Sequence, residues 1–378
     1  MKHKILLGIS LLCLVIVFAL FSFGLPEIVG PFLIFAFATL AIGLRGYDSF
    51  KGFSYTVWIL AAVTVAMYYP AYFVEVAGFQ LSSLIVPLLQ IIMFGMGTAM
   101  SLKDFNGVIK MPKPVFIGLA CQFTIMPIVG LTLTIIFGFP PEIAAGVILI
   151  GSAPSGLASN VMSYLANANL ALSITLTAVA TVLAPLVTPT LMSFLAGQYV
   201  PINFWDMMIS IVKMVIIPVI AGLLFNRIFH GKVKWLDEAM PIVSMVGIAF
   251  IIMIITAAGR DSLLQIGLLL IFAGIIHNIS GYLLGYWSCR LFKMDERSCR
   301  TIALEVGMQN GGLASGIALE MGKVATVGLA PAVFGPLMNI TGSSLATWWR
   351  AKPIKDDLPP QDHDKIVKNK PKPKSVKT

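Results

Sequence analysis

Residues 301 to 317 read TIALEVGMQNGGLASGI and combine an acid, two amides and four glycines in one apolar segment. Glu305 lies near the middle of this segment, and Gln309 and Asn310 follow it. A carboxylate at the centre of a lipid bilayer costs about 3 kcal/mol even on lenient insertion scales. Such a residue therefore faces a cavity or a partner, and we expect it to mark a functional site.

The composition of the whole chain is that of a membrane protein. Of its 378 residues, 58% are hydrophobic and 11% are charged, and the mean hydropathy is +0.91. These values exclude a water-soluble globular protein. The apolar runs are each about the 20 residues that cross a hydrocarbon core of about 30 Å. We expect an all-α polytopic membrane protein with twelve spans, at roughly 5–23, 26–44, 55–77, 81–101, 114–138, 142–165, 169–196, 206–226, 239–258, 262–289, 299–320 and 325–349.

The basic residues predict how the spans are oriented. With a cytoplasmic N-terminus, the outside loops hold only Arg260 and Lys323, and the inside loops collect the other loop cations. The positive-inside rule then places both termini in the cytoplasm, at the plasma membrane or at the inner membrane of a bacterium. The net charge of +9 follows from this asymmetry and requires no nucleic-acid partner. The basic tail, 351–378, is polar and proline-bearing, so we expect a disordered, solvated segment rather than one held by lipid headgroups.

The sixth and eleventh spans resemble one another. AGVILIGSAPSGLASNV (145–161) aligns without gaps with TIALEVGMQNGGLASGI, and both contain GLAS. The sixth span enters from outside and the eleventh from inside, so the repeat is inverted. Glycine and proline at mid-span break a helix and free backbone groups that lipid cannot satisfy. Breaks at corresponding positions of two halves predict a midplane site in a secondary transporter, whereas the alternative is that these glycines only permit close helix packing.

Neutral oxygen-bearing side chains accompany Glu305 at helical spacing or at the breaks. They are Gln309, Ser173, Thr177, Ser159 and Asn160. A carboxylate among hydroxyl, amide and backbone oxygens suits a small hard cation. The alternative for each hydroxyl is a hydrogen bond to its own helix backbone four residues earlier.

Five motifs together resemble the bile acid:sodium symporter family: ALEVGMQNGGLASG (303–316), SGLASNVMSYLANANLALSITLT (155–177), CQFTIMP (121–127), IIMFGMG (91–97) and MNITGSSLATWW (338–349). The resemblance covers about residues 55–349. It implies two inverted five-helix repeats with two discontinuous crossing helices, arranged as core and panel domains. The transporter unit would span 55–350, with repeats at about 55–197 and 205–350, and residues 1–54 would add an N-terminal transmembrane helix pair.

The resemblance also implies the site residues. One sodium ion would be bound by Ser159, Asn160, Ser173, Thr177 and Glu305. A second would be bound by Gln122, Glu305, Gln309 and the backbone carbonyls of Val306 and Met308. The substrate would contact Asn310, Asn339 and the backbone at Ser155 and Gly156. Met338 and Leu157 depart from residues that some relatives carry, and both changes concern the substrate.

The expected function is a sodium-coupled secondary symporter, not an enzyme, that imports an organic anion by alternating access. The anion would be bile acid-like or a small carboxylate, and the other partners are membrane lipids, with no oligomeric state specified by the sequence. One rival keeps the fold and couples to protons, because burial disfavours the charged form of Glu305. A membrane-embedded lipid-modifying enzyme is a poorer fit, since it needs several carboxylates or a nucleophile with its base. A channel or receptor fits the inverted breaks less well than a transporter does.

Overall fold

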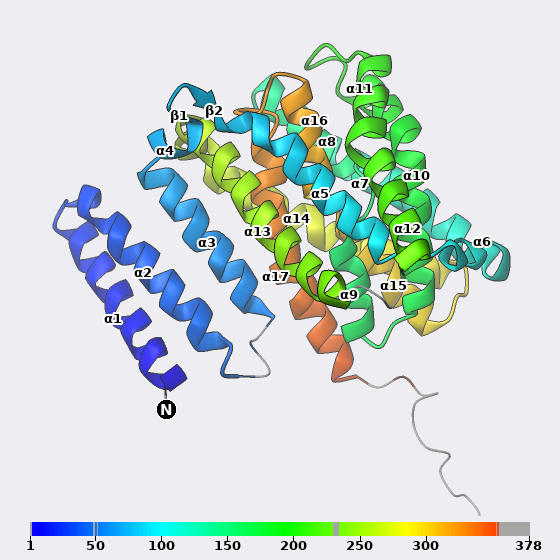
Figure 1. Cartoon of the computed structure of the whole chain (residues 1–378), viewed down its shortest axis with the longest axis horizontal. Helices are drawn as coiled ribbons and strands as arrows, with labels where there is room; N and C mark the ends of the chain where they lie inside the picture. Colours follow the sequence, from blue (N-terminus) through cyan, green and yellow to red (C-terminus); the bar gives the residue numbers. More distant parts are fainter. Residues whose placement is uncertain (1, 48–49, 51, 230–233, 353, 355–378) are drawn as a thin grey trace, which may run out of the picture.

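The chain is helical almost throughout. The computed structural model describes residues 2–47, 50, 52–229, 234–352 and 354 (Figure 1). Within these residues, eight helices are long and apolar enough to cross a membrane. The expected all-α polytopic membrane protein is therefore confirmed. Most of the basic tail predicted at 351–378 lies outside the described residues.

The N-terminal helix pair lies beside the rest of the molecule (Figure 1). It consists of α1 (Lys2–Ser22) and α2 (Pro26–Leu44), and α2 packs between α1 and α3 (Phe53–Tyr68). The Ser54 hydroxyl of α3 donates a hydrogen bond of 2.8 Å to the carbonyl of Ala41 in α2. The pair is thus joined to the rest of the molecule chiefly through α3.

A first group of helices is linked by successive contacts and is called the panel group here. Its members are α3, α5 (Ile85–Thr98) with the 3-10 turn Leu81–Leu84 before it, α11 (Phe204–Ile211), a π-helical turn (Val212–Ile216), α12 (Ile217–Phe229) and α13 (Lys234–Ala258). Two glycines, Gly97 of α5 and Gly222 of α12, face each other and let the two backbones touch. The panel group is therefore held together partly by direct backbone contact.

The remaining long helices form a second group, called the core group. Its members are α7 (Pro112–Phe137), α8 (Pro141–Ser152), α9 (Leu157–Leu165), α10 (Leu170–Leu195), α14 (Arg260–Leu291), α15 (Glu296–Gly307), α16 (Gly311–Glu320) and α17 (Leu329–Arg350). A 3-10 turn (Leu102–Phe105) and α6 (Asn106–Lys110) lead into α7. Every residue of α8 from 143 to 152, and of α15 from 298 to 307, is buried. The two helices that the sequence marks by their breaks are thus the most enclosed in the molecule.

The predicted span 55–77 is too long. α3 ends at Tyr68, and Pro70, which has no backbone N–H, stops its continuation. The chain then forms α4 (Ala71–Val74) and a short antiparallel hairpin of β1 (Glu75–Val76) and β2 (Phe79–Gln80). The turn residues Ala77 and Gly78 have φ angles of 52° and 81°. Apolar residues run on through 71–74, so the hydropathy pattern does not reveal where the helix ends.

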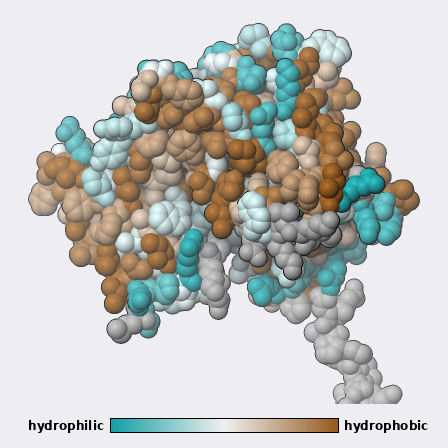
Figure 2. All heavy atoms as spheres, in the orientation of Figure 1, coloured by the Kyte–Doolittle hydropathy of each residue, from teal (hydrophilic) through white to brown (hydrophobic). Residues whose placement is uncertain are grey.

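The surface of the molecule matches its placement in a membrane. Figure 2 shows apolar side chains over much of the visible face, with hydrophilic residues near the upper and lower edges. The N-terminal end of α1 and the C-terminal end of α17 lie at one edge, called the terminal face, and the β1–β2 hairpin lies at the opposite edge (Figure 1). The broken helices meet between these two faces.

Candidate ion and substrate site

The two broken helices are tied together by their own backbones. α8 ends at Ser152 and α9 starts at Leu157, while α15 ends at Gly307 and α16 starts at Gly311. In the extended links, the Gly156 N–H donates to the Met308 carbonyl at 3.2 Å, and the Asn310 N–H donates to the Pro154 carbonyl at 2.8 Å. Ser155 and Gln309 form an isolated antiparallel bridge between these bonds. The breaks lie where glycine and proline predict them, and each link satisfies backbone groups that the other leaves free.

The Glu305 carboxylate lies beside this crossing and is surrounded by hydroxyl groups. Oε1 accepts hydrogen bonds from Ser159 at 2.6 Å and Ser173 at 2.5 Å, and Oε2 accepts from Ser155 at 2.6 Å and Thr177 at 3.0 Å. Glu305 is 2% exposed. Within the described part of the chain it forms no ion pair with a Lys, Arg or His. Its negative charge is thus balanced only by neutral donors.

A sixth residue, Asn160 of α9, adds an oxygen to this group. The Asn160 Oδ1 atom accepts from Ser173 at 2.8 Å and from Thr177 at 3.1 Å. The oxygen cluster, as we call it, consists of Glu305, Ser155, Ser159, Asn160, Ser173 and Thr177. Of the residues predicted to bind one sodium ion, Ser159, Ser173 and Thr177 therefore contact Glu305 directly. Asn160 is joined to them through Ser173 and Thr177. Three elements, α9, α10 and α15, and the link before α9 supply them.

The oxygen cluster has more oxygen contacts than hydrogens to fill them. Its four hydroxyl groups make seven short contacts, because the Ser159 hydroxyl also lies 2.8 Å from the Gly156 carbonyl. A hydroxyl has one hydrogen, so three contacts bring two oxygens together without one. A cation among these oxygens would remove the repulsion and neutralise the carboxylate.

Two glutamines form a second polar group on the other side of the crossing. Gln122 of α7 donates through Nε2 to the Gln309 Oε1 at 2.5 Å and to the Ala153 carbonyl at 3.1 Å. Gln309 in turn donates to the Val306 carbonyl at 2.6 Å. The Gln122 Oε1 atom is buried without a hydrogen-bond partner in the described structure. The structure thus brings together Gln122, Gln309 and Val306, and it leaves one buried acceptor oxygen available beside them.

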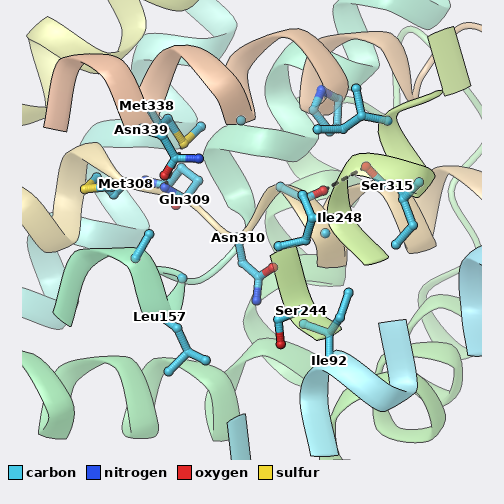
Figure 3. Close-up of a pocket in the computed structure, with 18 of the residues that line it drawn as sticks. Ile92, Leu157, Ser244, Ile248, Met308, Gln309, Asn310, Ser315, Met338 and Asn339 are labelled. Atoms are coloured by element: carbon cyan, nitrogen blue, oxygen red, sulfur yellow. Dashed lines mark hydrogen bonds between the residues drawn. The ribbon is translucent and has the colours of Figure 1, made fainter. Parts of the chain in front are cut away.

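A cavity of about 160 Å³ lies between the core and panel groups, next to the crossing. Its lining includes Gly156, Asn310 and Asn339, and it contains no acidic or basic side chain. Figure 3 shows Asn310 between Leu157 of α9 and Ser244 of α13. Asn310 is 8% exposed and its Oδ1 accepts from the Leu313 N–H at 3.0 Å. The cavity is therefore an uncharged, largely apolar space with amide groups at one wall.

The four residues predicted to contact the substrate divide between two places. Gly156, Asn310 and Asn339 line the cavity, whereas Ser155, whose backbone was predicted to contact the substrate, is not among the lining residues, and its hydroxyl donates to Glu305. The departures Met338 and Leu157 both line the cavity as well. Met308 also lines it, while its carbonyl accepts the Gly156 N–H across the crossing. The sequence marks Ser155 as part of a break, but nothing in it indicates which way the side chain turns.

Arg300 is a buried residue that the sequence analysis placed among the loop cations. It lies in α15, is 4% exposed and forms an ion pair of 2.9 Å with Glu296. Its guanidinium group also donates to the backbone carbonyls of Ala166, Trp349 and Lys352, at 3.2, 3.1 and 3.0 Å. Its position near the end of a span is that of an ordinary cytoplasmic cation. Its partners are backbone carbonyl groups, which every residue has, so the sequence does not indicate that Arg300 is buried.

Comparison with known proteins shows that the sequence of this chain is similar to sodium-dependent transporters. The model of the Sodium Bile acid symporter family matches residues 86–266. The uncharacterized sodium-dependent transporter YocS of Bacillus subtilis (strain 168) is 40% identical over 310 residues, which cover 82% of this chain and 94% of that protein. The probable sodium/metabolite cotransporter BASS1, chloroplastic, of Arabidopsis thaliana is 36% identical over 262 residues, or 69% of this chain and 65% of the relative. The Oryza sativa protein of the same name is 33% identical over 307 residues, covering 80% and 73%. All three are named as transporters or cotransporters and not as enzymes.

Proposed function

This chain belongs to the sodium bile acid symporter family, and from that premise we propose that it imports a small organic anion by alternating access, coupled to two sodium ions. It is an integral membrane transporter that uses sodium, as its relatives are named. The proposal concerns the ion number, the residues that bind the ions, the class of anion and the mechanism. The observation that carries it is the oxygen cluster around Glu305.

The first ion is assigned to the oxygen cluster. Sodium is a small hard cation, and hydroxyl, amide and carboxylate oxygens are the ligands that such cations prefer. These oxygens come from five residues on three helices, Ser159, Asn160, Ser173, Thr177 and Glu305, and Ser155 is a sixth residue that adds its hydroxyl oxygen. The excess of oxygens over hydrogens supports sodium over a proton, because a single added proton would fill only one of the three vacant contacts.

The second ion is assigned to the glutamine pair. Gln122, Gln309 and the carbonyls of Val306 and Met308 would bind it, and Glu305 would balance both charges. The unpaired Gln122 Oε1 atom supports this assignment, because a buried acceptor without a partner costs about 1–3 kcal/mol unless a cation or water meets it.

The substrate is assigned to the cavity between the two helix groups. α9 and α16 both begin at this cavity, so their free N–H groups and the positive ends of their dipoles favour an anion. Asn310 contributes an Nδ2 group that has no hydrogen-bond partner among the described residues. A volume of about 160 Å³ is below the roughly 300 Å³ of pockets for drug-sized ligands. This favours a small carboxylate over a steroid.

Sodium and substrate are coupled through the crossing in this proposal. The same links, 153–156 and 308–310, contact the ion-binding residues on one side and the cavity on the other. Ions that hold the crossing together therefore favour the arrangement of N–H groups that an anion needs. Coupling requires only that ions and substrate stabilise the same conformational state.

The proposed function predicts that sodium, and not a pH gradient, drives uptake. Proteoliposomes at equal internal and external pH should accumulate a radiolabelled small hydroxy acid when sodium is outside, and accumulate little when choline replaces sodium. A bile acid in the same assay tests the substrate class. Uptake that ignores sodium and follows an acidic exterior would favour the proton-coupled alternative and refute the proposal.

Substitution of Asn310 by aspartate should weaken binding of the anionic substrate without weakening binding of sodium. Aspartate keeps the acceptor oxygen that caps α16 through the Leu313 N–H, but it replaces the Nδ2 donor with a negative oxygen. Losing a hydrogen bond to a charged group costs about 1.5–3 kcal/mol, so the anion concentration for half-maximal uptake should rise at least about tenfold. Asn203→Asp, at the N-terminal cap of α11, is the matched control. An unchanged anion requirement in Asn310→Asp would remove Asn310 from the substrate site.

A further inference from the structure

The loop between α9 and α10 determines how the two halves of the oxygen cluster meet. α9 carries Ser159 and Asn160, and α10 carries Ser173 and Thr177. The connection between them, residues 166–169, is called the α9–α10 loop. Any shift of this loop moves one pair of ligands relative to the other and to Glu305. The loop is therefore a control point for the geometry of the cluster.

The loop is well defined by its own backbone. The Ala166 N–H donates to the Met162 carbonyl and the Ala168 N–H to the Ser163 carbonyl, both at 2.9 Å. Asn167 has a φ angle of 52°, the left-handed conformation that commonly ends a helix. Asn169 then caps α10, since its Oδ1 accepts from the Leu172 N–H at 3.1 Å. The loop is thus joined by hydrogen bonds to the end of α9 and to the start of α10.

α15, the helix that carries Glu305, forms hydrogen bonds with both ends of this loop. At one end, Arg300 donates to the Ala166 carbonyl at 3.2 Å. At the other end, the Thr301 hydroxyl accepts from the Asn169 N–H at 2.9 Å and lies 3.1 Å from the Asn169 carbonyl, to which it donates. Thr301 is fully buried and lies one turn before Glu305 on the same helix face.

We propose that Thr301 and Arg300 are positioning residues for sodium, which fix the α9–α10 loop on α15 so that the hydroxyl groups of α9 and α10 meet the Glu305 carboxylate. This inference rests on the proposed role of the oxygen cluster in sodium binding. Neither residue touches the ion. Asn169, Ser173 and Thr177 are spaced four residues apart, so they share one face of α10, and the anchored Asn169 sets the height of the other two.

Arg300 also connects α15 to α17, the helix that carries Asn339. Its guanidinium group donates to the carbonyls of Trp349 in the last turn of α17 and of Lys352 just after it, and its Cζ atom lies 5.7 Å from the centroid of the Trp349 ring. Glu296 holds it from α15 and is itself contacted by the Tyr286 hydroxyl at 2.7 Å. A guanidinium group presents its donors in a fixed planar fork, so lysine could keep the charge but could not reach all of these carbonyls.

The decisive experiment compares Thr301→Val with Thr301→Ser. Valine has nearly the shape of threonine and lacks the hydroxyl, whereas serine keeps it. The measurement is the sodium concentration that gives half of the maximal thermal stabilisation of the purified protein without substrate. We expect Thr301→Val to raise this concentration at least about fivefold and Thr301→Ser to stay within about twofold of the wild type.

A matched control separates positioning from general destabilisation. Thr64→Val removes a buried hydroxyl in α3 that bonds only to its own helix, at the Leu60 carbonyl. It should lower the sodium-free melting temperature as a buried hydroxyl loss does, and leave the half-saturating sodium concentration unchanged. At saturating sodium, the substrate concentration for half-maximal uptake should be the same in Thr301→Val and wild type.

Each outcome decides between the alternatives. A half-saturating sodium concentration in Thr301→Val within twofold of wild type, or an equal rise in Thr301→Ser, would overturn the inference. Should Thr301→Val yield no folded protein, Arg300→Lys replaces it, and an unchanged sodium requirement there would be equally fatal. A wild type that gains no stability from sodium would overturn the proposed function together with this inference. A sodium-responsive wild type beside an unaffected Thr301→Val overturns this inference alone.

Discussion

Glu305→Gln should abolish the response of the protein to sodium. Glutamine keeps the shape of glutamate, but it removes the negative charge that balances the cations, and its Nε2 group repels them. Loss of a close charge in a buried site is worth on the order of 3 kcal/mol or more, which is about a hundredfold in sodium affinity. Thermal stabilisation by sodium and sodium-driven uptake should therefore both fall below detection at concentrations that saturate the wild type.

The same variant should leave the sodium-free fold intact or improve it. The wild-type carboxylate is buried with neutral partners only, so removing its charge also removes a desolvation penalty. Melting of Glu305→Gln in choline buffer should accordingly occur at or above the wild-type temperature. Glu27→Gln, in the exposed first turn of α2, controls for loss of a carboxylate elsewhere. A Glu305→Gln protein that sodium still stabilises would show that the ion binds without this carboxylate.

Gly222→Ala should prevent the panel group from packing. A Cβ atom on Gly222 would lie 2.1 Å from the Phe94 carbonyl oxygen and 2.8 Å from the Thr98 nitrogen. Both are backbone atoms of α5, so no side chain can turn away. The facing Gly97 has the same restriction, 2.2 Å from the Val219 carbonyl oxygen. The helices would have to separate, at a cost of about 3 kcal/mol or more.

The yield of monodisperse protein and its melting temperature measure this effect. We expect Gly222→Ala and Gly97→Ala each to lower the folded yield severely, whereas Gly267→Ala should behave as the wild type. Gly267 of α14 is a suitable control because a Cβ there meets only side-chain atoms of Leu263, the nearest at 3.7 Å. A stable Gly222→Ala protein would mean that α5 and α12 do not approach each other as closely as described.

The parts of the site that the sequence could predict are those with a strong local cost. A carboxylate in an apolar span, and glycine or proline at mid-span, each require an explanation wherever they occur, so Glu305 and the two breaks were predictable. Hydroxyl groups at helical spacing then pointed to Ser173 and Thr177. In the structure both hydroxyl groups donate to the Glu305 carboxylate, while their role as ion ligands stays a prediction.

The parts that the sequence could not predict depend on direction and on backbone partners. Ser155 lies in a break, and only the fold shows that its hydroxyl turns to Glu305 and not to the cavity. Arg300 binds backbone carbonyl groups, which every residue has, so no pattern of side chains in the sequence predicts its contacts. The end of α3 was missed because apolar residues continue past Tyr68.

The attachment of the N-terminal pair through α3 gives two helix ends whose separation can be measured, the start of α1 and the end of α17. α1 and α2 are joined to the panel group through α3, whereas α17, which ends on the same terminal face, is part of the core group and also contacts α3 and α13. Fluorophores at the start of α1 and at the end of α17 would therefore test the proposed movement of the panel group against the core group. Neither label would contact the ions or the anion, and the second label must spare the Trp349 and Lys352 carbonyl groups that accept hydrogen bonds from Arg300.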